Sequence, residues 1–233
     1  MTAKIVTVIN QKGGSGKTNV AMTLAASFGA RGFGTLVVDG DRQGTATKWY
    51  AGVPEDKTFP AKVINLSQAG GAIGRAMKDH VGAYDVVIVD TPGSISDGVP
   101  LATMLLADLA LVPMIPAPGD LWATTELLEL VKQAQGINGN LDVRVVPSMV
   151  VATNLAESAL AALKKVGLPL TSSFLTTRNA YRLAMTEGTS VLGLKDAKAV
   201  EESEHLADEV LGLLGLPKKK KPAGRAKNAG VEV

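Results

Sequence analysis

The sequence predicts a single α/β domain in which a mostly parallel, twisted sheet carries helices on both faces. Short runs rich in Val, Ile and Leu alternate with longer stretches of helical periodicity, as in repeated βα units. The chain is 46% hydrophobic but only 4% aromatic, so its core must consist mainly of aliphatic side chains, which is typical of parallel strands buried on both faces. A length of 233 residues suffices for one sizeable domain and is short for two.

The expected elements follow one another with short connections. Strands are expected at Ile5–Ile9, Thr35–Val38, Lys62–Leu66, Asp85–Val89, Leu109–Pro113, Val143–Val151 and Leu170–Phe174. Helices are expected at Lys17–Arg31, Gln68–His80, Val99–Ala107, Leu121–Gln135, Glu157–Val166, Arg178–Thr186 and Ala197–Leu214. The last helix has one apolar and one acidic face, so we expect it to pack on the domain with its charges facing outward.

The charge distribution separates a domain, residues 1–216, from a basic tail, residues 217–233. Leu216-Pro217 ends the last helix, and the tail beyond it has a net charge of +5 against −3 for the rest of the chain. Two interpretations of the tail stay open, a solvated disordered end and a contact with nucleic acid. The second interpretation would use four consecutive lysines, Lys218, Lys219, Lys220 and Lys221.

Composition excludes several classes of protein. Cysteine is absent, so the chain forms no disulfide, no thiolate zinc site and no cysteine-ligated iron–sulfur cluster. The segment before the first strand is too short for a signal peptide, and no apolar run approaches the ~20 residues that span a bilayer. We therefore expect a cytoplasmic protein without a membrane partner.

A glycine-rich segment joins the first strand to the first helix and has the composition of a phosphate-binding loop. Its glycines allow backbone N–H groups to wrap a triphosphate, and the helix N-terminus adds a favourable dipole. In such a loop Lys17 neutralises the β- and γ-phosphates, and the Thr18 hydroxyl binds Mg²⁺. The predicted nucleotide-binding residues are Lys12, Gly13, Gly14, Ser15, Gly16, Lys17, Thr18 and Asn19.

The loop departs from the usual Walker pattern at Gln11, where that pattern has its first glycine, and a second lysine, Lys12, follows. Lysine at this place is the mark of the deviant Walker A motif. The chain thus resembles the ParA/MinD superfamily, and above all the ParA ATPases that partition plasmids and chromosomes, over about residues 4–215. The resemblance implies ATP as substrate. It also implies that Lys12 reaches across a face-to-face homodimer to the other subunit's ATP, where it would offset repulsion between two polyphosphates.

Two further strands end in acidic residues. Asp90 follows an apolar run in the Walker B form and would hold Mg²⁺ through water. Asp39-Gly40-Asp41-Arg42-Gln43 resembles the family's Asp-x-Asp-Pro-Gln segment, with Arg42 in place of proline. The resemblance implies that Asp39 supports the Mg²⁺ shell and that Asp41 lies near the attacking water. The predicted catalytic residues are therefore Lys12, Lys17 and Asp41, and the predicted metal site comprises Thr18, Asp39, Asp41 and Asp90.

Weaker similarities leave alternatives open. Asn154 stands where relatives place an asparagine that contacts adenine, and a turn asparagine is the alternative. Arg178 and Arg182 match a late Arg-x-x-Tyr motif of small ParA proteins and lie one turn apart in an expected helix. They would form either a DNA-binding edge or a plain solvated face. The proposed edge comprises Lys164, Lys165, Arg178 and Arg182.

Absent features narrow the class further. The chain lacks the cysteines of nitrogenase-reductase-like members, and its tail lacks the apolar stripe of a MinD-like membrane helix. It begins at its first strand, which leaves no room for a helix-turn-helix domain and indicates the short ParA type. The implied cycle is ATP-dependent dimerisation, sequence-independent DNA binding on the nucleoid, and slow hydrolysis stimulated by a ParB-like centromere-binding adaptor. The alternatives are ParA-like positioning of a protein cargo, a dethiobiotin-synthetase-like enzyme, and a scaffold that binds ATP without hydrolysing it.

Overall fold

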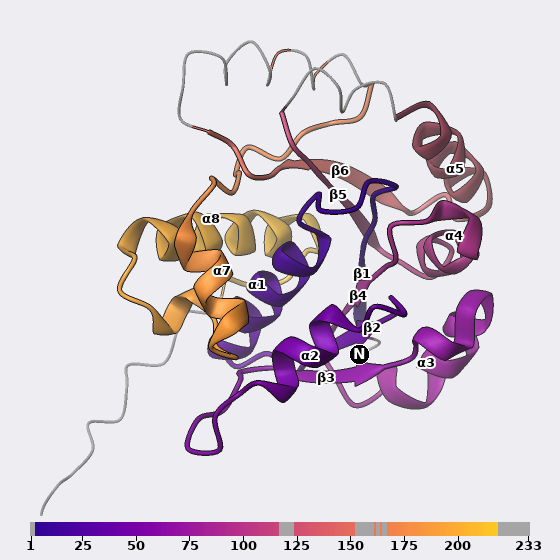
Figure 1. The fold of residues 1–233 in the computed structure, drawn as a ribbon. Coiled ribbons are helices and arrows are strands. Elements are labelled where there is room, and N and C mark those ends of the chain that lie inside the picture. The colour runs from indigo at the N-terminus through magenta and orange to yellow at the C-terminus, as the bar shows by residue number, and fades with distance from the viewer. Residues whose placement is uncertain (1–2, 117–123, 152–160, 162–163, 165–166, 219–233) are drawn as a thin grey trace, which may run out of the picture.

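The computed structural model describes residues 3–116, 124–151, 161, 164 and 167–218. Within these residues six parallel strands form one sheet in the order β3-β2-β4-β1-β5-β6 (Figure 1). The strands are β1 Lys4–Val8, β2 Thr35–Asp39, β3 Lys62–Asn65, β4 Val86–Asp90, β5 Leu109–Met114 and β6 Asp142–Pro147. The predicted α/β class with a parallel sheet is confirmed.

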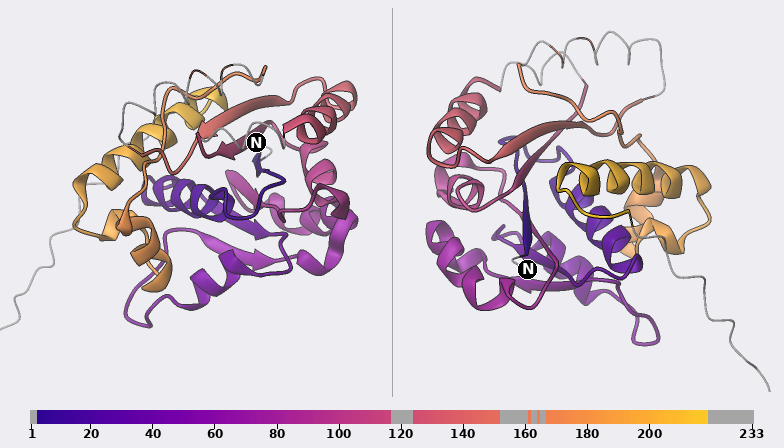
Figure 2. Two further views of the ribbon diagram at one scale, coloured as in Figure 1. Left: turned by 45° about the horizontal axis from the view of Figure 1, so that its top comes forward. Right: turned by 180° about the vertical axis from the view of Figure 1, so that it is seen from behind.

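Helices cover both faces of the sheet (Figures 1 and 2). Helices α1 (Lys17–Ala30), α7 (Asn179–Thr186) and α8 (Ala197–Leu213) lie on one face. Helices α3 (Ile73–Val81), α4 (Val99–Met104) and α5 (Thr124–Ile137) lie on the other, and α2 (Thr45–Ala51) lies beside β3. In the described part of the chain no helix has the length and apolarity that a membrane span requires.

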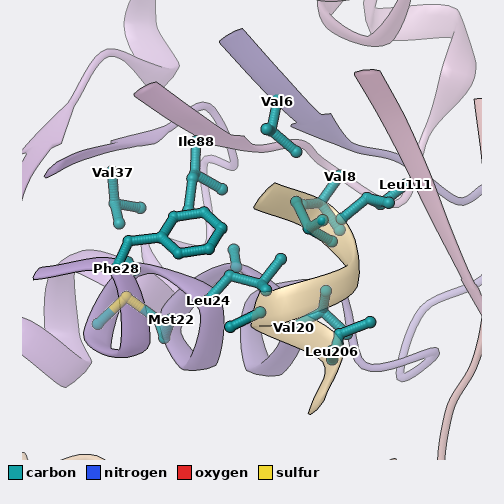
Figure 3. Close-up of a cluster of buried hydrophobic side chains, with 14 of the residues drawn as sticks. Val6, Val8, Val20, Met22, Leu24, Phe28, Val37, Ile88, Leu111 and Leu206 are labelled. Carbon is teal, nitrogen blue, oxygen red and sulfur yellow. The ribbon is translucent and has the colours of Figure 1, made fainter. Parts of the chain in front are cut away.

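The core between the sheet and α1 follows from two periodicities in the sequence. Val6 and Val8 of β1 point to the same face because strand side chains alternate. Val20, Leu24 and Phe28 recur every fourth residue of α1 and meet that face (Figure 3). Each is fully buried, and burying one such side chain contributes about 1.5–3 kcal/mol. Helix α1 is thereby fixed directly behind the loop that precedes it.

The acidic face of α8 differs from the prediction, since four of its carboxylates are bonded to the domain instead of facing solvent. Glu204 accepts a hydrogen bond of 2.7 Å from the buried Arg31 guanidinium, and Asp208 accepts another from the same group. Glu209 and Glu202 bind the segment at residues 172–178. The amphipathic pattern could not reveal these contacts, because their partners lie far away in sequence.

Two strand predictions near β6 are wrong: one strand is shorter than predicted, and the other does not form. Strand β6 ends at Pro147, where the expected segment ran to Val151, and Met149 beyond it has a left-handed φ of 53° that breaks the extended backbone. The predicted strand Leu170–Phe174 is reduced to a single bridge between Val145 and Leu170. The Thr171 N–H still donates to the Val145 carbonyl oxygen, but the N–H groups at 172 and 173 donate to the Glu209 carboxylate and so leave the ladder.

Other differences concern helix boundaries. Helix α2 was absent from the prediction because its sequence, Thr-Ala-Thr-Lys-Trp-Tyr-Ala, is short and lacks a clear helical stripe. Helix α7 begins at Asn179, so Arg178 precedes it with an extended backbone. Most of the predicted helix Glu157–Val166, and the tail beyond Lys218, lie outside the described residues.

Two glycines provide opposite tests of this packing. A Cβ on Gly29 of α1 would lie 2.1 Å from the Pro60 carbonyl oxygen, whereas one on Gly136 of α5 would meet no atom within 4 Å. We predict that Gly29→Ala lowers the free energy of unfolding by about 1–3 kcal/mol through overpacking. Gly136→Ala should raise it by about 0.5–1 kcal/mol, because alanine favours the helix. Urea denaturation of both variants tests the pair, and equal effects would contradict the packing described.

Candidate functional site

The loop between β1 and α1 is shaped by two glycines with left-handed backbones. Gly14 has a φ of 74° and Gly16 a φ of 93°, values that strongly favour glycine. A Cβ on Gly13 or Gly14 would meet nothing within 4 Å, so this stretch of backbone faces open space. Lys17 turns back from α1 and donates from Nζ to the Lys12 carbonyl oxygen at 3.2 Å. The Lys17 ammonium is thus held against the backbone of the loop.

The strand register brings an acid of β4 next to this loop. Asp90 ends β4 opposite Val8 of β1, and its Oδ2 accepts a hydrogen bond of 2.7 Å from Thr18 Oγ1. The carboxylate is fully buried, and its Oδ1 has no hydrogen-bond partner among the described residues. Burial raises the pKa of Asp90 to about 7; the Thr18 hydrogen bond opposes this rise and the Asp39 charge adds to it. A carboxylate in such surroundings is stabilised by a cation.

Asp39 ends β2 level with Asp90, and its carboxylate oxygens are engaged by the segment that follows it. Its Oδ2 accepts hydrogen bonds from the Thr47 backbone N–H and hydroxyl at 2.8 and 2.7 Å, and its Oδ1 accepts one from the Asp41 N–H at 3.2 Å. Asp41 itself is half-buried and accepts a hydrogen bond of 2.9 Å from the Gln43 N–H. Asp39 is therefore an anchor for the loop that presents Asp41.

Lys17, Thr18 and Asp41 line one open cleft of about 640 Å³, and Asp90 adjoins it through its hydrogen bond with Thr18. Burial lowers the pKa of Lys17, while the Asp90 and Asp41 carboxylates oppose that shift. The turn after β4 closes on the loop, since a Cβ on Gly93 would lie 3.6 Å from Lys17 Nζ. The cleft is lined by Gly13, Gly14, Gly16, Lys17, Thr18, Asn19, Asp41, Arg42, Gln43, Thr45, Pro92, Gly93, Ser94, Asp97 and Met149.

The cleft fits a polyphosphate with Mg²⁺. It offers open glycine backbone and the Lys17 ammonium, and the neighbouring residues Ser15 and Asp90 have buried oxygens without a partner among the described residues. Over that same part of the chain, no group of three or more His, Cys, Asp or Glu side chains is arranged to hold a metal ion. Mg²⁺ needs no such group, since it retains waters and binds one or two protein oxygens together with substrate phosphates. The hydroxyl of Thr18 and the carboxylate of Asp90 are oxygens of the kind that such a site would use.

A second, largely apolar pocket of about 380 Å³ adjoins the phosphate cleft. Gly16, Asn19 and Met149 line both spaces, so Met149 lies between them. The left-handed backbone of Met149 is unusual for a residue with a long side chain. The other lining residues are Trp49, Ser148, Leu175, Thr176, Thr177, Arg178, Tyr181, Arg182, Met185 and Thr186.

Sequence patterns did not predict this second pocket, because its walls come from separate segments. One signal was available. Ser148 and Met149 follow β6 directly, and residues at the carboxyl ends of parallel strands gather at the ligand-binding edge of an open sheet. The pocket wall formed by Thr176 to Arg178 follows no strand, so no sequence pattern predicted its place. Its position depends on hydrogen bonds to Glu202 of α8.

Four of the residues predicted to contact DNA lie within the described structure, and two of them, Arg178 and Arg182, line the apolar pocket. Lys164 and Arg182 are exposed, whereas Arg178 donates to Glu202 from two nitrogens at 2.8 and 2.9 Å. Lys218 Nζ lies 3.8 Å from an Asp208 oxygen. The remaining predicted residues lie outside the described part of the chain: Asn154, Lys165, Lys219, Lys220 and Lys221.

Two curated relatives are similar over most of their length. The chain is 30% identical to the maintenance of carboxysome distribution protein A of Halothiobacillus neapolitanus, over 88% of this chain and 94% of that one. It is 33% identical to the protein of the same name from Gloeobacter kilaueensis, over 85% and 88% of the two chains.

Solved structures share the fold. The Pyrococcus furiosus cell division ATPase MinD superposes with a TM-score of 0.74 at 20% identity, covering 91% of this chain and 99% of that one. Cobyrinic acid a,c-diamide synthase of Mycobacterium smegmatis, with an ATP analogue and magnesium bound, gives 0.73 at 22% identity over 90% and 94%.

The family assignment rests on the match over the domain itself. Residues 6–191 match the CobQ/CobB/MinD/ParA nucleotide binding domain, a range that includes the loop, both acidic strand ends and the Arg178 segment. The predictions of a ParA/MinD relative and of a nucleotide-binding ATPase that uses ATP and Mg²⁺ are confirmed at this level. The chain belongs to the CobQ/CobB/MinD/ParA nucleotide-binding family.

Proposed function

We propose that this chain is an ATP-driven switch that dimerises when it binds ATP and resets by hydrolysing it to ADP and phosphate. One observation carries the proposal: the loop lysine, the Thr18–Asp90 pair and Asp41 line or adjoin a single cleft that fits a polyphosphate. Hydrolysis is proposed to be slow alone and faster with a partner protein. Among the described residues that line the cleft, only Lys17 and the exposed Arg42 are cationic, so a partner could supply further positive charge.

The residues divide the work as follows. Backbone N–H groups of the loop and Lys17 hold the phosphates, and Thr18 with Asp90 holds Mg²⁺, which neutralises charge on the phosphate oxygens when bound. Asp41, kept in place by Asp39, orients the attacking water. Lys12 is exposed at the mouth of the loop, and we propose that it contacts the nucleotide of the second subunit.

The apolar pocket is the proposed site of the adenine base. It adjoins the phosphate cleft at Gly16 and Asn19, at the start of α1, which is where a nucleotide bound to the loop would extend. Leu175, Met149 and Tyr181 give it the apolar and aromatic walls on which a planar base can pack. We also propose, from the sequence alone, that Asn154 contacts the adenine base.

The proposed cargo is a protein assembly that is distributed within the cell. The relatives at 30% and 33% identity are carboxysome distribution proteins, which favours this cargo. Partition of a plasmid or chromosome is the second candidate, favoured by 29% identity to the protein ParA of Rhizobium radiobacter over 94% of that chain. Either function would use non-specific DNA of the nucleoid as the track and an adaptor as the stimulating partner, ParB-like in the second case.

Deletion of the gene in its native cell separates the two candidates. Clustered protein assemblies in cells that keep their plasmids and chromosome would support positioning of a protein cargo. Plasmid loss or cells without DNA, with assemblies evenly spaced, would support partition.

Lys17 and Lys12 should have separable roles in binding and dimerisation. Lys17→Ala removes the buried ammonium from the cleft, so ATP affinity of the monomer should fall by at least about 100-fold. Lys12→Ala should leave monomer affinity nearly unchanged and abolish the ATP-dependent dimer. Calorimetry and light scattering measure the two effects, with exposed Lys48→Ala of α2 as the control. An intact ATP-bound dimer in the Lys12 variant would exclude the role across the interface.

Asp41 should affect turnover more than binding. Asp41→Ala removes a group placed to orient water but leaves the loop and Lys17 in place, so the variant should bind ATP and dimerise while hydrolysing about 100-fold more slowly. Asp97→Ala removes an exposed carboxylate from the same cleft and is the matched control. Equal rates of phosphate release from the Asp41 variant and the wild type would refute the assignment.

DNA binding should depend on ATP and on Arg182 more than on Arg178, whose charge is already offset by Glu202. Arg182→Ala should reduce the salt dependence of binding, by about 0.9 in the log–log slope for each DNA phosphate that the variant no longer neutralises. Lys132→Ala on α5, on the opposite face of the sheet, should change nothing. Truncation after Leu216 should also flatten the slope without affecting hydrolysis. Equal binding to DNA without nucleotide, or a preference for one sequence, would contradict the proposal.

A further inference from the structure

One carboxylate of α8 gathers hydrogen bonds from three residues of a single segment. Glu202 accepts from the Thr176 backbone N–H at 3.0 Å and from the Thr176 hydroxyl at 2.8 Å. It accepts from Arg178 Nε and a terminal nitrogen at 2.9 and 2.8 Å, and from the Tyr181 hydroxyl at 3.1 Å. The Glu202 side chain is only 14% exposed, so these bonds replace most of its hydration.

All three partners line the apolar pocket, while Glu202 lies behind them and lines none of it. Hydrogen bonds from the other side hold the same segment. The Thr177 N–H donates to the Val150 carbonyl oxygen at 3.0 Å, and the Thr177 hydroxyl donates to the Met149 carbonyl oxygen at 2.9 Å. This wall of the pocket is therefore held between the residues that follow β6 and the Glu202 carboxylate, and Asp196, which caps α8, lies 3.9 Å from Arg178 as a second carboxylate.

We propose that Glu202 is a positioning residue for the nucleotide base, which fixes the pocket wall from α8 without touching the nucleotide. The inference rests on the proposed function, since it assumes that the apolar pocket receives the base of ATP. Without the Glu202 carboxylate the pocket wall would adopt several positions, and ATP would bind only to molecules whose wall is in the position that fits the base. The apparent affinity falls in proportion to the fraction of molecules that hold the competent wall.

The pairing also accounts for the use of arginine and tyrosine in the Thr-Arg-Asn-Ala-Tyr-Arg segment. Burial raises the pKa of Glu202, but its bonds to Arg178 and Thr176 outweigh this effect and keep the pKa below its usual range. Burial and the neighbouring Glu202 charge both raise the pKa of Tyr181, so its hydroxyl stays a donor. Glu202 therefore stays ionised as an acceptor, while the Arg178 guanidinium and the Tyr181 hydroxyl stay donors to it.

The test compares ATP with inorganic tripolyphosphate, which occupies the loop but has no base. Glu202→Gln keeps the side-chain shape but replaces a charged acceptor with an amide, so the ATP Kd should rise about tenfold. The tripolyphosphate Kd should change by less than about twofold, because the P-loop contacts are untouched. Calorimetry on the full chain measures both.

Glu209→Gln is the matched control. Glu209 lies on the same helix and accepts two backbone N–H groups at 2.7 Å from the same segment, but from Ser172 and Ser173, which do not line the pocket. Its Gln variant should leave the ratio of the two dissociation constants unchanged. A selective loss of ATP affinity in both variants, or equal loss of ATP and tripolyphosphate affinity in Glu202→Gln, would overturn the inference.

Thr176→Val provides a second variant should Glu202→Gln fold poorly. It removes one hydroxyl donor, keeps the side-chain volume, and should lower ATP affinity selectively but by less than Glu202→Gln. An unchanged ratio in Thr176→Val would overturn the inference. Wild-type protein that binds ATP no better than tripolyphosphate would overturn it too and leave the P-loop function standing. Wild-type protein that binds neither compound would overturn the proposed function as well.

Discussion

The structure depends on the parallel register of three central strands. Val8 pairs with Asp90, and Asp90 pairs with Asp39, so the ends of β1, β4 and β2 lie level at one edge of the sheet. The loop after β1 must therefore pass beside both acids. A shift of one residue between β1 and β4 would turn Asp90 to the other face of the sheet and separate it from Thr18. A shift between β2 and β4 would likewise turn Asp39 away from the loop that presents Asp41. The aliphatic core, buried on both faces, opposes that shift.

The second determinant is the polar face of α8, which holds segments far from it in sequence. Its carboxylates bind Arg31 at the end of α1 and the residues 172–178 beside the apolar pocket. Removing one partner from such a pair leaves a charge with reduced hydration, which destabilises far more than removal of an exposed pair. Helix α8 is therefore bonded both to the end of α1, the helix that follows the phosphate loop, and to the wall of the apolar pocket. It fixes these two parts of the site relative to each other.

The local part of the site could be predicted from sequence, and the non-local part could not. Gly14, Gly16, Lys17 and Thr18 act within a few residues of one another, so spacing alone indicated their arrangement. The positions of Asp39 and Asp90 could be predicted from the rule that parallel strands end at the same edge of a sheet. By contrast, the bonds from Asp39 to Thr47 and from Glu202 to Thr176 join residues whose types are common and whose spacing carries no signal. The false strand Leu170–Phe174 has the same non-local cause, since Glu209 takes its N–H groups, whereas helix α2 was missed because its short sequence lacks a helical stripe.

Charge places a final constraint on how such a domain could contact DNA. Outside the tail the chain has a net charge of −3, and Arg178, Arg31 and Lys4 each have a carboxylate partner in the structure. The domain without its tail therefore attracts a polyanion weakly. Two copies of the exposed Arg182 and Lys164, together with two tails, would double the basic groups that one duplex meets. Attraction to DNA then rises with dimerisation, because counterion release grows with the number of phosphates contacted. The proposed gating of DNA binding by ATP would therefore need no conformational change beyond the pairing of two subunits.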